Sequence, residues 1–158
     1  PEASELSPFL RTTSFVEIVA YCLNPNHFHL ILKQLSDGGI SKFMHKLGLG
    51  YTTYFNAKYD RVGSLFQGTF KAKHINTDEY LLWLSVYVNY NAQIHSITND
   101  ASIYPWSSCA EYLRSDNNIC VKNIILEQFK DGKDYENFAK ETLPEIFERK
   151  ELEKYLIE

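Results

Sequence analysis

The chain has 158 residues, of which 44% are hydrophobic, 15% aromatic and 23% charged. This length and composition fit one domain with a normal core, and they exclude a disordered tail, a collagen-like chain and a low-complexity linker. No apolar run reaches the roughly 18 residues of a membrane span and no signal peptide opens the chain, so we expect no membrane partner. Because the first residue is Pro1 rather than Met, we expect a trimmed product.

The charge is unevenly distributed. The 16 basic and 20 acidic residues give a formal net charge of -4, which by itself disfavours a nucleic-acid partner. Residues 33–73, however, hold seven basic and two acidic residues, a net charge of +5, while the segments on both sides are acidic. This distribution predicts one positive face on an acidic protein, with a pair of solvated helical faces as the alternative.

Three cysteines, Cys22, Cys109 and Cys120, show no paired spacing. We therefore expect no disulfide framework and a reducing, cytoplasmic location.

The first half of the chain predicts a hairpin followed by a helix. Residues 15–22 and 27–33 are rich in β-branched and aromatic residues, as strands are, and Asn24-Pro25-Asn26 between them favours a turn. Apolar residues recur at three- and four-residue steps over 40–59, which predicts a helix. Residues 70–75 alternate between apolar and basic side chains, which predicts a half-buried strand.

The second half predicts helices only. Thr77 is a suitable N-cap for a helix that runs to about Gln93, and a short helix follows Pro105. The last 40 residues predict two or three small helices, broken at Asp131-Gly132 and at Pro144. The fold class is therefore α+β, an antiparallel sheet with helices packed on it and a helical C-terminal appendage.

The sharpest local motif is His27-Phe28-His29. On a strand, side chains two residues apart project from the same face, roughly 6–7 Å apart along the strand. Two such imidazoles form half of a site for a divalent metal, or else a pair of polar residues on an exposed face.

A second grouping lies on the helix expected over 77–93. Tyr87 and Asn91 are four residues apart and so lie one turn apart on one face. A tyrosine can attack phosphorus, and an amide oxygen can complete a metal site, although an aromatic stripe on a helix more often belongs to the core. His45, His74 and His95 are isolated; of these, His74 borders the basic strand and could contact phosphate.

Several ordered blocks resemble one family. YCLNPNHFHLILK (21–33) resembles the metal-binding strand of HUH single-tyrosine transposases, and more specifically that of the REP-associated tyrosine transposases. The blocks YTTYFNAKYDRVGSLFQGTFKA (51–72), DEYLLWLSVYVNYNA (78–92) and YPWSS (104–108) follow in the same order. The resemblance implies an HUH endonuclease fold with a ferredoxin-like, RRM-like core.

The resemblance also implies site residues. In the family the nucleophile lies in a block like Y-I-x-x-N-P, which reads YVNYNA (87–92) here, so the resemblance implies Tyr87 as the nucleophile. The spacing agrees, since the rivals Tyr80 and Tyr90 lack a polar residue four positions later. His27, His29 and Asn91 match the ligands of a divalent ion, Mg²⁺ or Mn²⁺. For DNA contacts we select polar and basic residues within the stretch 33–73, which would follow the phosphates: Lys33, Lys42, Lys46, Arg61, Gln67, Lys71 and Lys73.

Three departures from the family pattern stand out. The opening strand of the family is missing ahead of Phe15, Thr69 replaces an Arg, and Ala92 replaces a Pro. We therefore expect a catalytic domain over 1–114, short of its N-terminal strand, and an appendage over 115–158.

The implied activity is metal-dependent cleavage and rejoining of single-stranded DNA. Tyr87 would form a 5′-phosphotyrosine on DNA associated with a hairpin, and the protein would act as a monomer or a homodimer, as relatives do. Two alternatives are a non-catalytic or domesticated protein that binds hairpin DNA, and a metal-dependent phosphodiesterase that uses water.

Overall fold

A computed structural model describes residues 14–114 and 119–155, with side chains as far as Lys150. The chain divides into two compact units. The first unit contains the residues up to Glu17 together with Lys33–Lys71, and the second contains Ile18–Leu32 together with the chain from Ala72 onward.

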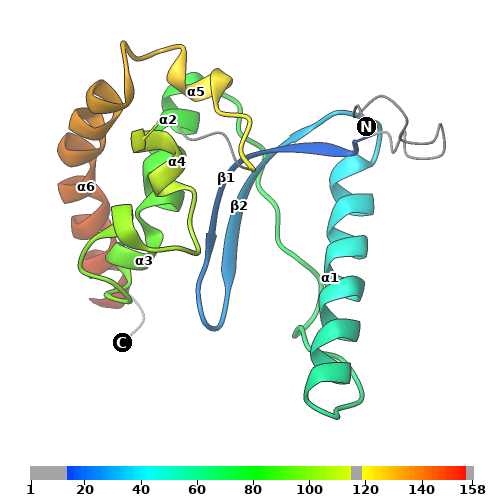
Figure 1. The fold of residues 1–158 in the computed structure, drawn as a ribbon. Coiled ribbons are helices and arrows are strands. Elements are labelled where there is room, and N and C mark those ends of the chain that lie inside the picture. The colour runs from blue at the N-terminus through cyan, green and yellow to red at the C-terminus, as the bar shows by residue number, and fades with distance from the viewer. Residues whose placement is uncertain (1–13, 115–118, 156–158) are drawn as a thin grey trace, which may run out of the picture. The chain divides into compact units, whose positions relative to one another are not determined.

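Two strands, β1 (Val16–Leu23) and β2 (Phe28–Gln34), pair as an antiparallel hairpin, as predicted (Figure 1). The amide N–H of Asn24 donates to the carbonyl of His27 at 2.9 Å and closes the turn. Beyond the hairpin, Ser107 forms an isolated antiparallel bridge with Cys22.

The strand predicted over 70–75 is wrong: this segment has no regular secondary structure. No neighbouring strand pairs with it, and of its side chains only that of Ile75 packs against the core. Alternation of apolar and basic residues cannot form a strand where no partner supplies the ladder of hydrogen bonds. The family strand expected to be missing concerns residues ahead of Phe15, most of which lie outside the described part of the chain.

Helix α1 (Gly39–Lys58) confirms the helix predicted over 40–59. Helix α2 (Asp78–Asn89) begins after Thr77, whose hydroxyl accepts a hydrogen bond from the N–H of Tyr80 at 3.2 Å, so the predicted N-cap is confirmed. The helix does not continue to Gln93. It is interrupted at Tyr90, and a short helix α3 (Asn91–Ile94) follows.

The C-terminal part contains short helices and one long one: a 3-10 turn η2 (Ala101–Ile103), α4 (Cys109–Arg114), α5 (Asn123–Leu126) and α6 (Gly132–Tyr155). The helix after Pro105 is thus confirmed as α4. The predicted break at Pro144 is wrong, because α6 runs through this residue. Leu143 and Ile146 on either side of Pro144 are buried in the core, and this packing offsets the proline's lost hydrogen bond.

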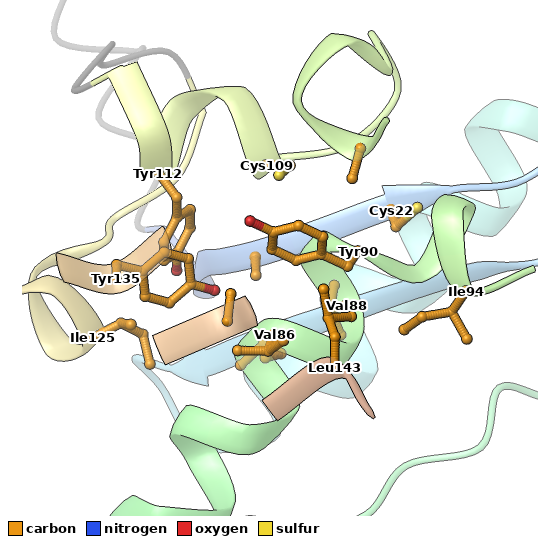
Figure 2. Packing of buried hydrophobic residues seen from close by; sticks show 14 of the residues in the cluster. Cys22, Val86, Val88, Tyr90, Ile94, Cys109, Tyr112, Ile125, Tyr135 and Leu143 are labelled. Carbon is orange, nitrogen blue, oxygen red and sulfur yellow. The ribbon is translucent and has the colours of Figure 1, made fainter. Parts of the chain in front are cut away.

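The described buried core belongs to the second unit. Helices α2, α4 and α6 lie side by side there and pack against the hairpin residues of the same unit (Figure 1). Figure 2 shows the apolar side chains that they share, including Val86, Tyr112 and Tyr135. The α+β class is therefore confirmed, whereas the boundary predicted after residue 114 falls next to residues that are not described and stays a prediction.

Among the described residues, no helix is long and apolar enough to cross a membrane. Cys22, Cys109 and Cys120 are all free and buried. The cytoplasmic location stays a prediction.

Candidate active site

The hairpin turn and the start of β2 bring His27 and His29 together. Their ring centroids lie 5.1 Å apart, with the planes at 85°. His27 is the last residue of the turn and His29 is the second residue of β2, so their spacing by two puts both rings on one face, as predicted.

Tyr87, on the last turn of α2, packs against one of these two histidines, His29. Its ring centroid is 5.4 Å from that of His29, with the planes at 78°. Its ring also contacts that of Trp83, which stacks parallel to it at 5.8 Å. Two aromatic rings therefore fix the orientation of the Tyr87 phenol, which is half-buried.

Asn91 begins α3 and reaches the site through another side chain, Asn24. The side-chain amide nitrogen of Asn24 donates to Oδ1 of Asn91 at 2.7 Å and lies 3.0 Å from Nε2 of His27. One donor thus joins acceptor atoms of two of the three predicted metal ligands. Asn91 is fully buried, and its own amide nitrogen has no hydrogen-bond partner among the residues that the structure describes.

His95 is a member of the cluster that sequence reasoning missed. Its ring centroid lies 5.4 Å from that of His27, and both line an open pocket of about 400 Å³ with Pro25, Asn26 and Ile97. The one signal in the sequence is the four-residue spacing from Asn91, which puts the two on one helical face. Asn24 was missed as well, because a turn residue carries no spacing signal.

The environment of His29 favours the neutral imidazole. Burial, followed by the charges that His27 and His95 would carry, lowers the pKa of His29 from 6.5 to about 4. The pKa of His95 is also lowered, first by burial and then by Lys150 and His27. At neutral pH His29 therefore keeps a free lone pair.

Helix α6 supports the helices that carry Tyr87 and Asn91. The guanidinium of Arg149 lies 5.4 Å from the ring centroid of Trp83, on which Tyr87 stacks. The ammonium of Lys150 donates to the carbonyl oxygen of Ile94, the last residue of α3. The C-terminal helix thus contacts the middle of α2 and the last residue of α3.

The rival tyrosines lie in different surroundings. Tyr90 is part of the core, 7% exposed, and burial raises the pKa of its hydroxyl far above the usual value. Tyr80 stacks on Trp83 with ring centroids 6.4 Å apart, and the ammonium of Lys73 lies over its ring. Of the three, only Tyr87 has a ring contact with His29.

The seven residues predicted to contact DNA are all exposed. Six belong to the first unit, and Lys73 belongs to the second. Within the first unit, Lys33 pairs with Glu17 at 3.1 Å, and the ammonium of Lys46 lies 4.8 Å from the ring centroid of Phe15.

In the described part of the chain, no three His, Cys, Asp or Glu side chains are grouped so that they could hold a metal ion. The predicted set is of a different kind, since it combines two imidazoles with the amide of Asn91.

Comparison with known protein families shows the family to which this chain belongs. The family described as IS200-like transposase matches residues 4–91, more than half of the chain. The chain belongs to the IS200-like transposase family. Neither curated proteins nor solved structures provide a further match.

IS200-like transposases cut and rejoin DNA, so the partner of this chain is DNA. The match ends at Asn91 and thus includes the hairpin, α1, α2 and Tyr87. Helix α6, with Arg149 and Lys150, lies beyond it.

Proposed function

We propose that this IS200-like transposase cleaves and rejoins single-stranded DNA next to a hairpin, through a covalent bond between Tyr87 and a 5′ phosphate. The observation that carries the proposal is the meeting of His27, His29 and Tyr87, with ring centroids 5.1 and 5.4 Å apart, in a chain of this family.

The residues of the cluster fit a divalent ion. His29 is held neutral, so that an imidazole nitrogen can donate a lone pair. Nε2 of His27 and Oδ1 of Asn91 both lie within hydrogen-bond distance of one donor, the Asn24 amide nitrogen, and their lone pairs therefore converge. Imidazole nitrogen and amide oxygen suit Mg²⁺ or Mn²⁺. His27, His29 and Asn91 would hold the ion, which supplies polarisation of the scissile phosphate when bound.

Tyr87 is the nucleophile in this proposal. Its phenolic oxygen forms a bond to phosphorus while the bond from phosphorus to the 3′ oxygen breaks. The phenol loses its proton to solvent, and the departing oxygen takes one up as a free 3′ hydroxyl. Stacking on Trp83 and contact with His29 hold the phenol in one orientation, which lowers the entropic cost of reaching the phosphate.

The covalent link makes the reaction reversible. The phosphotyrosine ester keeps the energy of the cleaved phosphodiester, so a 3′ hydroxyl from another strand can attack it and release Tyr87 without ATP. Cleavage and rejoining are then one step run in two directions.

The first prediction concerns the covalent adduct. A labelled single-stranded hairpin incubated with the full chain and Mn²⁺ should give an adduct that survives a denaturing gel. Tyr87→Phe should abolish the adduct and leave DNA binding intact, because only the hydroxyl is removed. Tyr80→Phe, the same change two turns earlier on α2, serves as the matched control and should form the adduct normally.

Two results would contradict the proposal. Tight binding of the hairpin without any adduct would assign the chain to the non-catalytic DNA-binding proteins. Cleavage that persists in Tyr87→Phe and disappears in His27→Ala would assign the reaction to water and the histidine site.

A further inference from the structure

Helix α1 is a long helix with almost no buried residue. Of its 20 residues only Gly39 is buried, although Leu47, Leu49, Tyr51 and Tyr54 are large and apolar or aromatic and lie exposed. A helix of this length normally buries an apolar stripe. Helix α1 contains three lysines and no aspartate or glutamate.

Neighbouring rings of the first unit form a continuous group, which we call the aromatic platform: the exposed Tyr51, Tyr54, Tyr59 and Phe66 and the half-buried Phe55. The ring of Tyr51 lies 6.4 Å from Tyr54, 6.1 Å from Phe55 and 6.1 Å from Phe66, measured between centroids. Phe55 lies 4.5 Å from Tyr59. Tyr51, Tyr54 and Tyr59 are each about half exposed, at 49%, 58% and 55%.

Cations lie among these rings. The ammonium of Lys58 is 5.7 Å from the centroid of Tyr54 and 5.4 Å from that of Tyr59. The guanidinium of Arg61 is 5.6 Å from the centroid of Phe55. The platform therefore combines the π-faces of its rings with two positive charges, which lie near the C-terminal end of α1.

The loop after α1 is fastened to the helix. The amide nitrogen of Asn56 donates to the carbonyl of Gly63 at 2.9 Å, and the N–H of Arg61 donates to the carbonyl of Asn56 at 2.9 Å. These hydrogen bonds hold the loop that carries Phe66 beside Tyr51. The rings of the platform are therefore held in place by bonds within the first unit.

We propose that the aromatic platform binds the unpaired bases of single-stranded DNA, with Lys58 and Arg61 at the backbone phosphates. This inference rests on the proposed function for the class of nucleic acid. Bases stack on aromatic side chains whatever their sequence, and stacking is worth about 1–3 kcal/mol per base. Duplex DNA hides these faces within its own stack, so the surface favours unpaired strands.

Charge complementarity favours single-stranded DNA over a protein partner or a second copy of the chain as the ligand of the platform. The platform contributes positive charge, α1 carries no carboxylate, and single-stranded DNA is a polyanion. Two copies meeting through α1 would oppose lysine to lysine, and the chain as a whole is acidic outside this stretch.

The second prediction tests the platform by base stacking. The double variant Tyr51→Leu/Tyr54→Leu keeps apolar area and removes two rings, so its affinity for oligothymidylate, which forms no hairpin, should fall about tenfold or more. Fluorescence anisotropy at fixed salt measures the dissociation constant. Phe147→Leu removes an exposed ring from α6 and should leave the affinity unchanged.

An unchanged affinity of the double variant for oligothymidylate would overturn the platform. If light scattering also showed that the variant had lost a dimer, the surface would be assigned to a second copy of the chain instead. If the circular dichroism of the double variant shows that helical structure is lost, the Lys58→Gln variant tests the platform instead. Its salt slope for oligothymidylate should fall by about 0.7 if Lys58 contacts a phosphate, and an unchanged slope would overturn the assignment.

The platform and the proposed function can fail separately. Platform-dependent binding without a Tyr87 adduct leaves the platform standing and removes the catalytic proposal. A Tyr87 adduct with no effect of the platform variants removes the platform alone. Failure of the wild-type chain to bind either oligonucleotide removes both.

Discussion

His29 lies between a second imidazole and the proposed nucleophile, in a half-buried position that a charged side chain would occupy only at a cost. Burial contributes most to its lowered pKa of about 4, and the charges of His27 and His95 add to it. The ring of His27 also restricts the imidazole sterically, because it meets His29 edge to face. At neutral pH the imidazole of His29 is therefore uncharged, and its ring is already oriented.

The third prediction follows from this pKa. Between about 6.5 and about 4, unfolded His29 takes up a proton that folded His29 does not, so the free energy of unfolding should fall as the pH is lowered through this window. Urea denaturation with EDTA at pH 7 and pH 4.5 measures the fall. It should be smaller in His29→Gln.

His45 supplies the control, because it is exposed on α1. His45→Gln should show the same dependence on pH as the wild-type chain. If His29→Gln loses as much stability on acidification as His45→Gln, the low pKa of His29 is contradicted.

At this scale the sequence predicts contacts that depend on local periodicity alone. A spacing of two residues brought His27 and His29 to one face. The single helix expected to carry both Tyr87 and Asn91 is instead interrupted at Tyr90, so the spacing of four did not by itself fix how these two residues lie. Asn24 could not be predicted, because its two hydrogen bonds depend on the path of the turn. His95 could not be predicted either, since the interruption of the helix at Tyr90 and the packing of α3 determine where its ring lies.

Among the elements, α6 is joined to α2 by buried polar contacts. The hydroxyl of Tyr135 lies 3.1 Å from that of Ser85 and accepts a hydrogen bond from the amide nitrogen of Asn89 at 2.8 Å. Ser108 in turn donates to Oδ1 of Asn89 and accepts from the N–H of Tyr21 on β1. Helix α6, helix α2 and strand β1 are therefore tied together beneath the site.

The fourth prediction tests this network. Tyr135→Phe leaves the Asn89 amide nitrogen buried without its partner, and the free energy of unfolding should fall by about 1–3 kcal/mol. Urea denaturation monitored by far-ultraviolet circular dichroism measures it.

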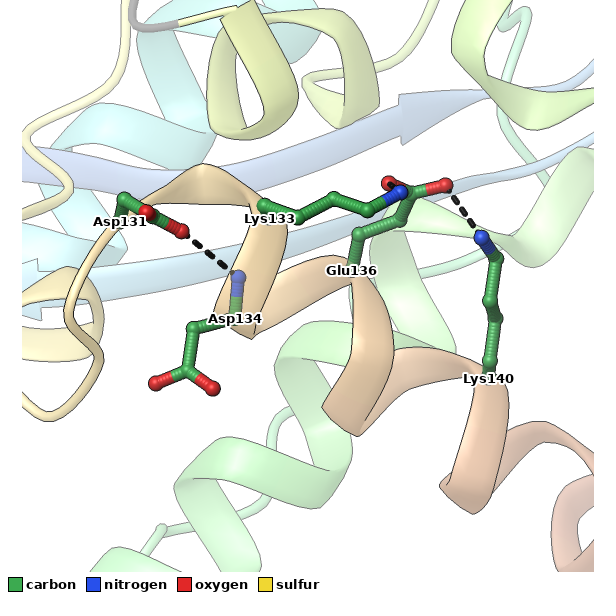
Figure 3. A network of polar contacts seen from close by, with 5 residues as sticks. All are labelled: Asp131, Lys133, Asp134, Glu136 and Lys140. Atoms are coloured by element: carbon green, nitrogen blue, oxygen red, sulfur yellow. Dashed lines mark hydrogen bonds and ion pairs between the residues drawn. The ribbon is translucent and has the colours of Figure 1, made fainter.

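A surface network on the same helix provides the control. Glu136 pairs with Lys133 at 2.8 Å and Lys140 at 2.6 Å near the start of α6, where Asp131 also accepts from the N–H of Asp134 (Figure 3). Because these lysines are exposed, Glu136→Gln should cost less than about 1 kcal/mol. An equal loss in both variants would show that the buried bonds contribute no more than the surface pairs.

Elements were predicted well where one local signal was enough. The apolar period of α1, the Thr77 cap and the turn of the hairpin each act within a few residues. The strand over 70–75 failed because a strand needs a partner from elsewhere in the chain. The break at Pro144 failed because Leu143 and Ile146 are held by the core, a tertiary effect that a local signal does not contain.

For the whole molecule, the placement of charge matters more than its sum. A net charge of -4 coexists with a stretch of +5, and six of the seven residues expected to contact DNA lie in the first unit. We therefore expect weak, salt-sensitive binding to duplex DNA and dependence on a particular folded strand.

The fifth prediction separates the two units by charge. Lys42→Gln/Lys46→Gln should reduce the salt slope for single-stranded DNA by about 0.7 per lysine, because each lost phosphate contact releases fewer counterions. Lys133→Gln/Lys140→Gln changes the total charge equally in the second unit and should leave the slope as it is. Binding titrations from 50 to 200 mM salt measure both, and equal slopes in the two variants would contradict a basic DNA surface.

The division into units could not be predicted, because each unit is built from segments that are not consecutive. Reading along the chain separates only consecutive stretches, such as those expected before and after residue 114. Both strands instead pass from one unit to the other, at Glu17–Ile18 and at Leu32–Lys33.

This threading has a mechanical consequence. The chain crosses between the units three times, the last at Lys71–Ala72. If a protease cut the chain there, the N-terminal fragment would still hold Val19, Ala20 and Ile31, which are buried in the core of the second unit. The two fragments would therefore stay associated as one nicked particle, joined by packing rather than by a peptide bond.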